Sequence, residues 1–306
     1  MTNKLRIVIS GLIFPLTIMR YFWEAFEHRE NVELIVTGPF SGSWIPWRGG
    51  MELPQRYVKH PDIPLPKTTA SMRPDPKIVE IQLPWKPDLW IQFDAGFHFS
   101  RRPDARVVAL VETDPHCLKP HYKLPKSYSD FTFSMQLVYS EPGEHYLPYA
   151  YSKYHHFHED LQKKYDACMI GLQYEQRTRL INKLVSRNKK VFYDIGVVFD
   201  EYRRVYNASK IGLNWSSLLD LNARCFELLA MGSCAVMNRV PDLPTFFVEG
   251  EHFVAFSDVD EAEKKILELL EDDDMREEIA NAGYRKVNGH HYDARVQQML
   301  EIMKMV

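Results

Sequence analysis

A chain of 306 residues with a formal net charge of −3 has no overall electrostatic attraction to nucleic acid or to an anionic membrane. Hydrophobic residues make up 45% of it and charged residues 26%, which is typical of a soluble protein with one large domain or two average ones. The 4 cysteines lack C-x-x-C spacing, which argues against a zinc ribbon or a disulfide framework. No apolar run reaches about 18 residues, and no cleavage-site pattern follows the N-terminus, so we predict a cytoplasmic protein without a membrane span.

The N-terminal segment has a strand–glycine–helix pattern. Leu5–Ile9 is typical of a buried strand, Ser10-Gly11 follows it, and a helix is expected around Thr17–Glu27. Val32–Thr37 is the second expected strand. This β-α-β order is typical of a Rossmann-like domain, although the G-x-G-x-x-G fingerprint of a dinucleotide site is missing.

Residues 38–76 contain many prolines and show no periodic pattern. Proline can neither donate to a β-ladder nor continue a helix, so we expect an irregular segment that is either disordered or functional. Trp44 and Trp47, near Arg48 and Gly49-Gly50, could stack on a sugar or a base. They could equally anchor the segment to the core.

Two more strands are expected at Lys86–Phe93 and Arg106–Val111. Glu112, Asp114 and His116 follow the second of them. Ligands of an open parallel sheet lie beyond the carboxyl ends of its strands, so these side chains stand where chemistry can occur. We select Asp114 and His116 as candidate catalytic residues, while noting that Asp-Pro also commonly begins a loop.

A strand at Asp130–Ser134 and a helix or turn at Gln136–Tyr139 lead toward the middle of the chain. Lys153–Glu159 then holds three histidines whose spacing does not make a helical metal-binding pair, which favours a polar crossover between domains. The expected division is a first domain at 1–155, a second at 156–290, and a C-terminal helix at 291–306 that can cross back to the first.

The second half begins with a strand at Tyr165–Gly171 and a helix at Gln173–Leu184 that carries Arg177. A strand, a glycine and a basic helix can together cradle a diphosphate. Arg179, two positions further on, would point elsewhere on the helix. Further elements are expected at Lys190–Tyr193 (strand), Phe199–Asn207 (helix), Phe246–Phe256 (loop and strand), Asp258–Glu271, Asp272–Val287 and Ala294–Met305 (helices).

Residues 206–241 predict a strand, a polar loop, a helix and a second strand. Asn222 is expected to cap the helix, with Arg224 in its first turn, where unpaired N–H groups and the dipole favour an anion. Arginine can donate two parallel hydrogen bonds to a phosphate. Glu227, one turn further along the helix, can accept hydrogen bonds from two hydroxyl groups, such as those of a ribose. Equally, Asn222 could simply cap, with Arg224 and Glu227 on a solvated face.

Three motifs in this half resemble the donor-binding core of group 1, retaining glycosyltransferases of the GT-B fold. They are Ser-Lys-Ile-x-Leu-Asn (209–214), Asn-x-Arg-x-Phe-Glu (222–227) and Ala-x-Gly (230–232), and the subgroup named for a spore-maturation protein is the most similar. The similarity extends over residues 140–300 and covers the first half only in outline. It implies an α/β protein with two Rossmann-like domains facing a cleft, and sugar transfer with retention from a nucleotide-diphosphate-sugar donor.

The candidate donor-binding set is Gly11, Arg177, Lys210, Asn222, Arg224 and Glu227. In the resembling family, fixed cations and helix N-termini stabilise the departing diphosphate in place of a metal. We therefore expect no metal site, no cofactor, and activity that survives EDTA. The family often carries two glutamates eight positions apart. Glu227 matches the second, but Leu219 stands at the first position, with Asp220 beside it.

Two other functions stay open: a sugar-nucleotide epimerase or phosphorylase of the same fold, and an inactive family member that binds a nucleotide sugar or a partner. The acceptor could be a glycan, a protein, a small molecule or a modified nucleic acid. A local basic strip of Arg101, Arg102 and Arg106 could track phosphates. The sequence specifies neither the nucleobase, the sugar nor the oligomeric state.

Overall fold

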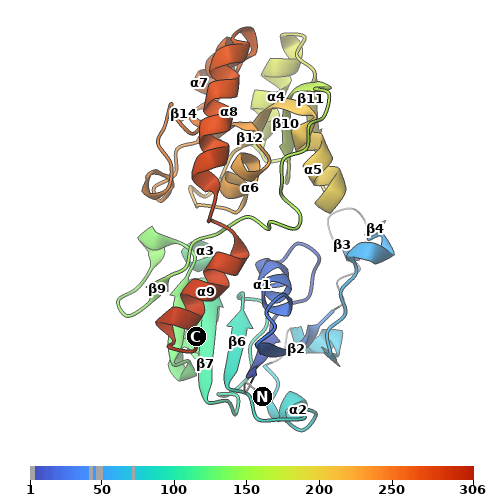
Figure 1. Ribbon diagram of the computed structural model, residues 1–306, viewed down its shortest axis with the longest axis vertical. Coiled ribbons are helices and arrows are strands. Elements are labelled where there is room, and N and C mark those ends of the chain that lie inside the picture. Colours follow the sequence, from blue (N-terminus) through green and yellow to red (C-terminus); the bar gives the residue numbers. More distant parts are fainter. Residues whose placement is uncertain (1–3, 41–43, 46–50, 71–72) are drawn as a thin grey trace. The chain divides into compact units, whose positions relative to one another are not determined.

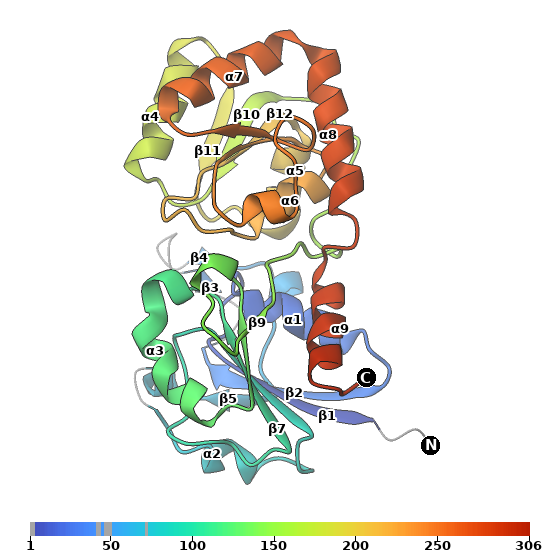
Figure 2. The same ribbon diagram turned by 90° about the vertical axis from the view of Figure 1, so that its left-hand side faces the viewer.

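The computed structural model describes residues 4–40, 44–45, 51–70 and 73–306, which fold into two compact α/β units (Figures 1 and 2). The first unit comprises Met1–Pro148 and Tyr292–Val306, and the second comprises Tyr149–His291. Each unit has a parallel sheet with helices packed against it, so the expectation of two Rossmann-like domains is confirmed.

The main sheet of the first unit has seven parallel strands in the described residues, in the order β5-β2-β1-β6-β7-β8-β9. All five residues of the central β6 are buried, because helices and loops cover both faces of a parallel sheet. The strands are β1 (Leu5–Ser10), β2 (Val32–Pro39), β5 (Ile63–Leu65), β6 (Leu89–Phe93), β7 (Val107–Glu112), β8 (Phe131–Ser134) and β9 (His145–Tyr146). A short antiparallel hairpin pairs β3 (Trp44–Ile45) with β4 (Met51–Glu52).

Helices α1 and α9 lie side by side in the first unit (Figure 1). The ring of Tyr292 lies 5.1 Å from that of Tyr21 and 5.2 Å from that of Phe22, measured between centroids. These buried aromatic contacts place the C-terminal helix in the first unit. The helices are α1 (Ile18–Glu27), α2 (Lys77–Glu80), α3 (Pro115–Tyr128) and α9 (Tyr292–Ile302), with 3₁₀ turns η2 (Gln55–Tyr57), η3 (Lys67–Ala70) and η4 (Leu137–Tyr139).

Two elements of the first unit differ from the sequence predictions. The segment at 38–76 is not irregular throughout, because β5 extends the parallel sheet. Pro64 is compatible with β5 because this strand lies at the sheet edge, where a missing N–H costs little. Helix α3 was not predicted, since Pro120 and Pro125 interrupt its pattern. Trp47, Arg48, Gly49 and Gly50 lie outside the described residues, as does the side chain of Trp44.

The second unit has a five-stranded parallel sheet in the order β11-β10-β12-β13-β14. Its strands are β10 (Tyr165–Ile170), β11 (Val191–Asp194), β12 (Ser209–Asn214), β13 (Cys234–Asn238) and β14 (Val254–Phe256). Its helices are α4 (Glu175–Ser186), α5 (Phe199–Asn207), α6 (Arg224–Ala230), α7 (Val259–Glu271) and α8 (Asp273–Val287), with the 3₁₀ turn η5 (Leu243–Thr245).

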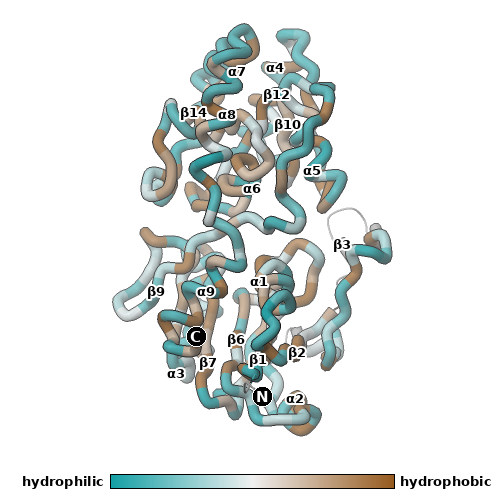
Figure 3. Tube along the Cα trace, viewed as in Figure 1, coloured by the Kyte–Doolittle hydropathy of each residue, from teal (hydrophilic) through white to brown (hydrophobic). Residues whose placement is uncertain are grey.

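Buried residues recur every three or four positions along helices α7 and α8, among polar ones (Figure 3), so each helix buries one face. The carboxylate of Asp258 accepts hydrogen bonds from the backbone N–H groups of Asp260 and Glu261, both at 2.9 Å, and so caps α7. Asp272 caps α8 in the same way, through the N–H of Met275. None of the described helices has the length and apolar content needed to cross a membrane.

Candidate functional site

Two arginines converge at the carboxyl edge of the second unit's sheet. Arg177 lies in the first turn of α4, after β10, and Arg224 is the first residue of α6, after β12. A methyl group on Gly171, which follows β10, would lie 3.1 Å from Nη2 of Arg224 and 3.2 Å from Nη1 of Arg177. The absence of a side chain at Gly171 therefore lets both guanidinium groups approach the same piece of backbone.

Neutral groups hold both arginines in place. Arg177 donates from Nε to the carbonyl oxygen of Trp215 and from Nη1 to that of Leu172, each at 2.9 Å. Arg224 donates from Nη1 to Oδ1 of Asn214 at 3.2 Å, and its buried Nε–H has no partner in the described part of the chain. Hydrogen bonds to carbonyl and amide oxygens orient a guanidinium without neutralising it.

The electrostatics of this pair favour an anion. Arg177 is 7% exposed, and burial, followed by the positive charge of Arg224, lowers the pKa of Arg177 to about 10. Within the residues that the structure describes, neither guanidinium forms an ion pair with a carboxylate. Burial acts to lower the pKa of Arg224, but Tyr206, Tyr202 and the charge of Glu227 raise it overall. The two guanidinium groups still repel each other, and an anion placed between them would relieve that repulsion.

Glu227 lies one helical turn after Arg224, and a hydrogen bond from Tyr202 orients its carboxylate, with His156 nearby. The hydroxyl of Tyr202, on α5, donates to Oε2 at 2.6 Å, and Nε2 of His156 lies 3.7 Å from Oε1. Burial, followed by the charge of Glu227, raises the pKa of Tyr202 well above its ordinary value. The tyrosine therefore stays protonated and keeps donating.

His156 has a defined tautomer. The backbone N–H of Ser152 donates to Nδ1 of His156 at 3.1 Å, so Nδ1 is an acceptor and the proton of a neutral ring is on Nε2, facing Glu227. The neighbouring His155 instead packs on Phe199, and Nδ1 of His158 contacts the carbonyl oxygen of Met231. The three histidines thus point to three different places and do not form a metal-binding set.

Asn222 does not cap α6, so that prediction is wrong. Ala223 already has helical dihedrals and precedes the helix without a side-chain cap. The side-chain amide of Asn222 stands one residue too early, and its Oδ1 accepts a hydrogen bond from Nδ2 of Asn214 at 3.1 Å. Asn222 therefore helps to orient Asn214, which in turn holds Arg224.

Lys210 lies apart from the arginine pair. It is the second residue of β12, at the amino end of a strand whose carboxyl end leads to Arg224. Its Nζ lies 3.9 Å from Oδ1 of Asp166, near the start of the neighbouring β10. Four strand residues of about 3.3 Å each separate Lys210 from the carboxyl edge, so it does not join Arg177 and Arg224 around one anion.

Gly11 lies in the first unit, and close packing accounts for it. A methyl group there would lie 2.7 Å from Sδ of Met19 and 3.1 Å from the carbonyl oxygen of Phe93. Asp220, the acid beside the position of the family's first glutamate, forms a short side-chain hydrogen bond with the hydroxyl of Ser216. It therefore closes the loop that follows β12.

Asp114 and His116 lie at the start of α3, where β7 ends. Together with the exposed Cys117 they form the group in the described chain that could hold a metal ion, with their ligand atoms within 4.8 Å of one another. Glu112 is fully buried and pairs with Lys126, with Oε1 3.0 Å from Nζ. The structure therefore brings the two candidate catalytic residues together and gives Glu112 a structural role.

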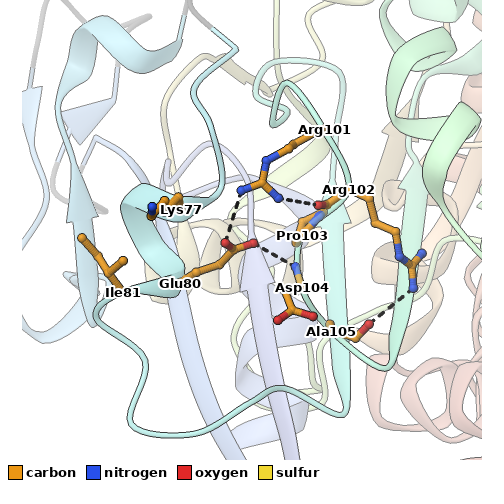
Figure 4. A pocket seen from close by; sticks show the side chains of 8 residues that line it. All are labelled: Lys77, Glu80, Ile81, Arg101, Arg102, Pro103, Asp104 and Ala105. Atoms are coloured by element: carbon orange, nitrogen blue, oxygen red, sulfur yellow. Dashed lines mark hydrogen bonds and ion pairs between the residues drawn. The ribbon is translucent and has the colours of Figure 1, made fainter.

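The basic strip is neutralised by acids of its own unit. Arg101 pairs with Asp75 and Glu80, Arg102 with Asp130, and Arg106 with Asp88. An open pocket of about 640 Å³ lies beside Arg101 and Arg102, where Glu80 binds both Arg101 and the backbone N–H of Asp104 (Figure 4). It lies just before β7, at the amino edge of the sheet, opposite the edge where ligands of such sheets bind.

Residues 153–301 match a family model described as "Glycosyl transferase-like". No curated protein sequence matches the chain. Among solved structures, an alpha-glucosyltransferase in complex with UDP superposes with a TM-score of 0.64 and 12% identity, over 98% of this chain and 100% of that one. Sucrose-phosphate synthase from Thermosynechococcus elongatus gives 0.63 and 11%, over 98% of each chain. UDP-N-acetylglucosamine 2-epimerase gives 0.56 and 11%, over 99% and 98%.

These likenesses, together with the two parallel sheets, show the GT-B fold. At such low identity they define the architecture alone. The chemistry depends on the residues of this chain, above all Arg177, Arg224 and Glu227.

Proposed function

We propose that this protein is a retaining glycosyltransferase that moves a sugar from a nucleotide-diphosphate sugar to an acceptor. One observation carries the proposal: Arg177 and Arg224 meet at Gly171 without a carboxylate partner in the described chain. When the bond between the sugar and the donor breaks, the leaving diphosphate gains negative charge. Two preorganised cations stabilise that charge more strongly than they stabilise the intact donor, and this difference lowers the barrier.

Glu227 supplies the second half of the donor site. A carboxylate held by Tyr202 and His156 keeps lone pairs for two further donors, which matches the paired hydroxyls of a ribose. Solved relatives of the fold carry UDP or UDP-glucose, and one alpha-glucosyltransferase carries DNA as well. We therefore place UDP-sugars first among candidate donors, with the acceptor left to experiment.

The test is to incubate the protein with UDP-, GDP-, ADP- and dTDP-activated sugars and to follow the products by NMR. A transferase releases free nucleoside diphosphate, slowly even with water as acceptor, and a retaining one keeps the anomeric configuration. An epimerase, the second candidate favoured by a structural neighbour, would change the sugar of UDP-N-acetylglucosamine instead. A donor that raises the melting temperature but is never cleaved would identify a binding module and contradict the proposal.

We expect turnover to be insensitive to EDTA, because Arg177 and Arg224 provide the charge that a divalent ion supplies in metal-dependent enzymes. Initial rates with and without chelator measure this directly. Activity that disappears in EDTA and returns with manganese would show that a metal ion performs this task.

Replacing Tyr202 by phenylalanine should weaken the preference for ribose over deoxyribose. A hydrogen bond from the ribose 2′-hydroxyl to the oriented carboxylate of Glu227 should contribute about 1.5–3 kcal/mol to the binding free energy. The wild type should therefore bind UDP roughly 10- to 100-fold more tightly than 2′-deoxy-UDP. Without its 2.6 Å bond from Tyr202, Glu227 loses its fixed orientation and the ratio should fall. Calorimetric titration measures both affinities.

Tyr206→Phe is the matched control. Tyr206 lies one turn further along α5, and its hydroxyl accepts a hydrogen bond from the backbone N–H of Ile170 rather than contacting Glu227. This variant should lose stability but keep the wild-type ratio of affinities. If Tyr202→Phe left the ratio of the UDP and 2′-deoxy-UDP affinities unchanged, Glu227 would not be the residue that binds the ribose 2′-hydroxyl.

A further inference from the structure

The second unit has a pocket of about 520 Å³ that is separate from the arginine pair. Its lining comes from residues 151–157 and from the last turns of helices α6 and α8, which pack against each other (Figure 2). Neither Arg177 nor Arg224 lines it. Its volume lies within the range of pockets that bind small molecules.

Close helix packing makes the floor of this pocket rigid and apolar. A methyl group on Gly283 of α8 would lie 2.7 Å from Cδ2 of Leu229 of α6, so the glycine lets the two helices approach each other closely. Ala230 and Val287, at the ends of these helices, are buried and form the floor. A ligand therefore meets a preformed surface and does not have to order it.

Two aromatic side chains are exposed beside this floor. Tyr284 is 46% exposed and Phe157 is 37% exposed, so the two rings together give the pocket an apolar surface that solvent reaches. Residues that do not line the pocket hold both rings. The guanidinium carbon of Arg203 lies 4.1 Å from the centroid of the Phe157 ring, and the ring centroids of His158 and Tyr284 are 6.1 Å apart. Rings that are already held in place can pack against a flat ligand at a small cost in entropy.

The charged side chains of the pocket are basic. Lys153 and Arg285 line it, whereas none of the described acidic side chains does. Arg285 forms no ion pair with any residue that the structure describes. Lys286, the next residue in the last turn of α8, does not line the pocket. Both cations interact favourably with the C-terminal end of the helix dipole, so what distinguishes Arg285 is its place in the pocket.

We propose that this pocket binds a small anionic molecule that carries a planar ring, of which an aryl phosphate is the simplest example. The ring would pack against Tyr284 and Phe157, and the anionic group would accept charge-assisted hydrogen bonds from Arg285. The charge of Lys153 would add to the attraction. A neutral ring would lack the interaction with the cations, and inorganic phosphate would lack the contacts with the rings. This second site does not depend on sugar transfer at the first.

The probe is 1-naphthyl phosphate, with 1-naphthol as its neutral counterpart and inorganic phosphate as its counterpart without a ring. Equilibrium dialysis of the full-length protein at neutral pH, followed by naphthyl fluorescence, measures both naphthyl compounds. With the donor site saturated by UDP, 1-naphthyl phosphate should bind about 10-fold more tightly than 1-naphthol, or better, because only the phosphate reaches the cations. An equal concentration of inorganic phosphate should not displace it.

The same dialysis is repeated with Arg224→Met in the absence of nucleotide. This variant lacks one of the two arginines proposed to bind diphosphate, so the probe should bind to it as tightly as to the wild type with UDP. Failure of the proposed donor site would leave this result unchanged. The two proposals can therefore fail independently of each other.

Variants of the last turn of α8 locate the probe. Arg285→Met should weaken the binding of 1-naphthyl phosphate about 10-fold or more and leave 1-naphthol unchanged, and Tyr284→Ala should weaken both compounds. Lys286→Met removes a cation from the same turn and is the matched control, which should bind the probe as the wild type does. All three side chains are exposed, and melting temperatures check that the variants fold. The comparison of the probes in the wild type requires no variant.

Several results would overturn the proposal. Equal affinities for the two naphthyl compounds would indicate an unspecific apolar surface, and displacement by an equal concentration of phosphate would indicate a plain anion site. Equal losses in Arg285→Met and Lys286→Met would indicate a general effect of charge. Binding that disappears in Arg224→Met would assign the probe to the donor site, and a wild type that binds none of the probe at millimolar concentration would have no such site.

Discussion

Replacing Arg224 by methionine should abolish tight binding of nucleoside diphosphates while the second unit stays folded. The guanidinium of Arg224 faces the space beside Gly171 together with that of Arg177, and a diphosphate would accept charge-assisted hydrogen bonds from both. Losing one arginine should cost about 3 kcal/mol of binding free energy, on the order of 100-fold in affinity. Titration calorimetry with UDP and other nucleoside diphosphates measures the loss.

The melting temperature separates the loss of binding from a loss of stability. Removing Arg224 relieves the repulsion that lowers the pKa of Arg177, but it also takes away the positive charge that the buried carboxylate of Glu227 favours. These two effects on the ligand-free protein oppose each other, whereas the increase of the melting temperature on adding nucleotide should vanish. Arg179→Met, an exposed position on α4, is the control and should bind as the wild type does. Equal losses in both variants would contradict a specific role for Arg224.

Replacing Lys126 by methionine should destabilise the first unit by about 3–5 kcal/mol at pH 8. Nζ of Lys126 lies 3.0 Å from Oε1 of Glu112 and 2.9 Å from Oε2 of Glu141, and it also forms an ion pair with Oε1 of Glu144. The side chains of Glu112 and Glu144 are only 1% and 6% exposed, so removing the lysine leaves buried negative charges uncompensated. Urea unfolding at several pH values measures the effect.

The pH dependence of this effect has a definite sign. Burial raises the pKa of Glu112 to about 7, although Lys126 acts to lower it, so wild-type stability falls as pH rises from about 4.5 to about 7. Without Lys126, ionising Glu112 costs more, and the destabilisation should be larger at pH 8 than at pH 5, where the carboxyl is protonated. Lys119→Met removes a mostly exposed partner of Glu141 and should cost less than about 1 kcal/mol at either pH. A pH-independent loss in Lys126→Met would show that buried charge is not the cause.

Most of the fold could be predicted from the sequence because its signals are local. Buried parallel strands such as β1, β7 and β12 are short, nearly continuous apolar runs, and the apolar residues of α7 recur with helical spacing. The prediction was wrong for β5 and α3, which both contain proline. Proline is tolerated in β5 because the strand lies at the edge of the sheet, and the packing of α3 on β7 outweighs the local preference of its prolines against a helix.

The site was only partly predictable, since motif spacing does not show which edge of a sheet a residue reaches. Arg177, Arg224 and Glu227 follow carboxyl ends of strands and come together, whereas Lys210 stands at the amino end of β12. Tyr202 and His156 reach Glu227 through contacts 25 and 71 positions apart in the chain (227 − 202 and 227 − 156), and neither belongs to a recognisable motif.

A crystal structure with the nucleoside diphosphate that raises the melting temperature most would test the central claim directly. We expect diphosphate oxygens within hydrogen-bonding distance of both Arg177 and Arg224, and ribose hydroxyls within hydrogen-bonding distance of Glu227. A diphosphate bound elsewhere, for example beside Lys210 at the opposite edge of the sheet, with both guanidinium groups unoccupied, would contradict it.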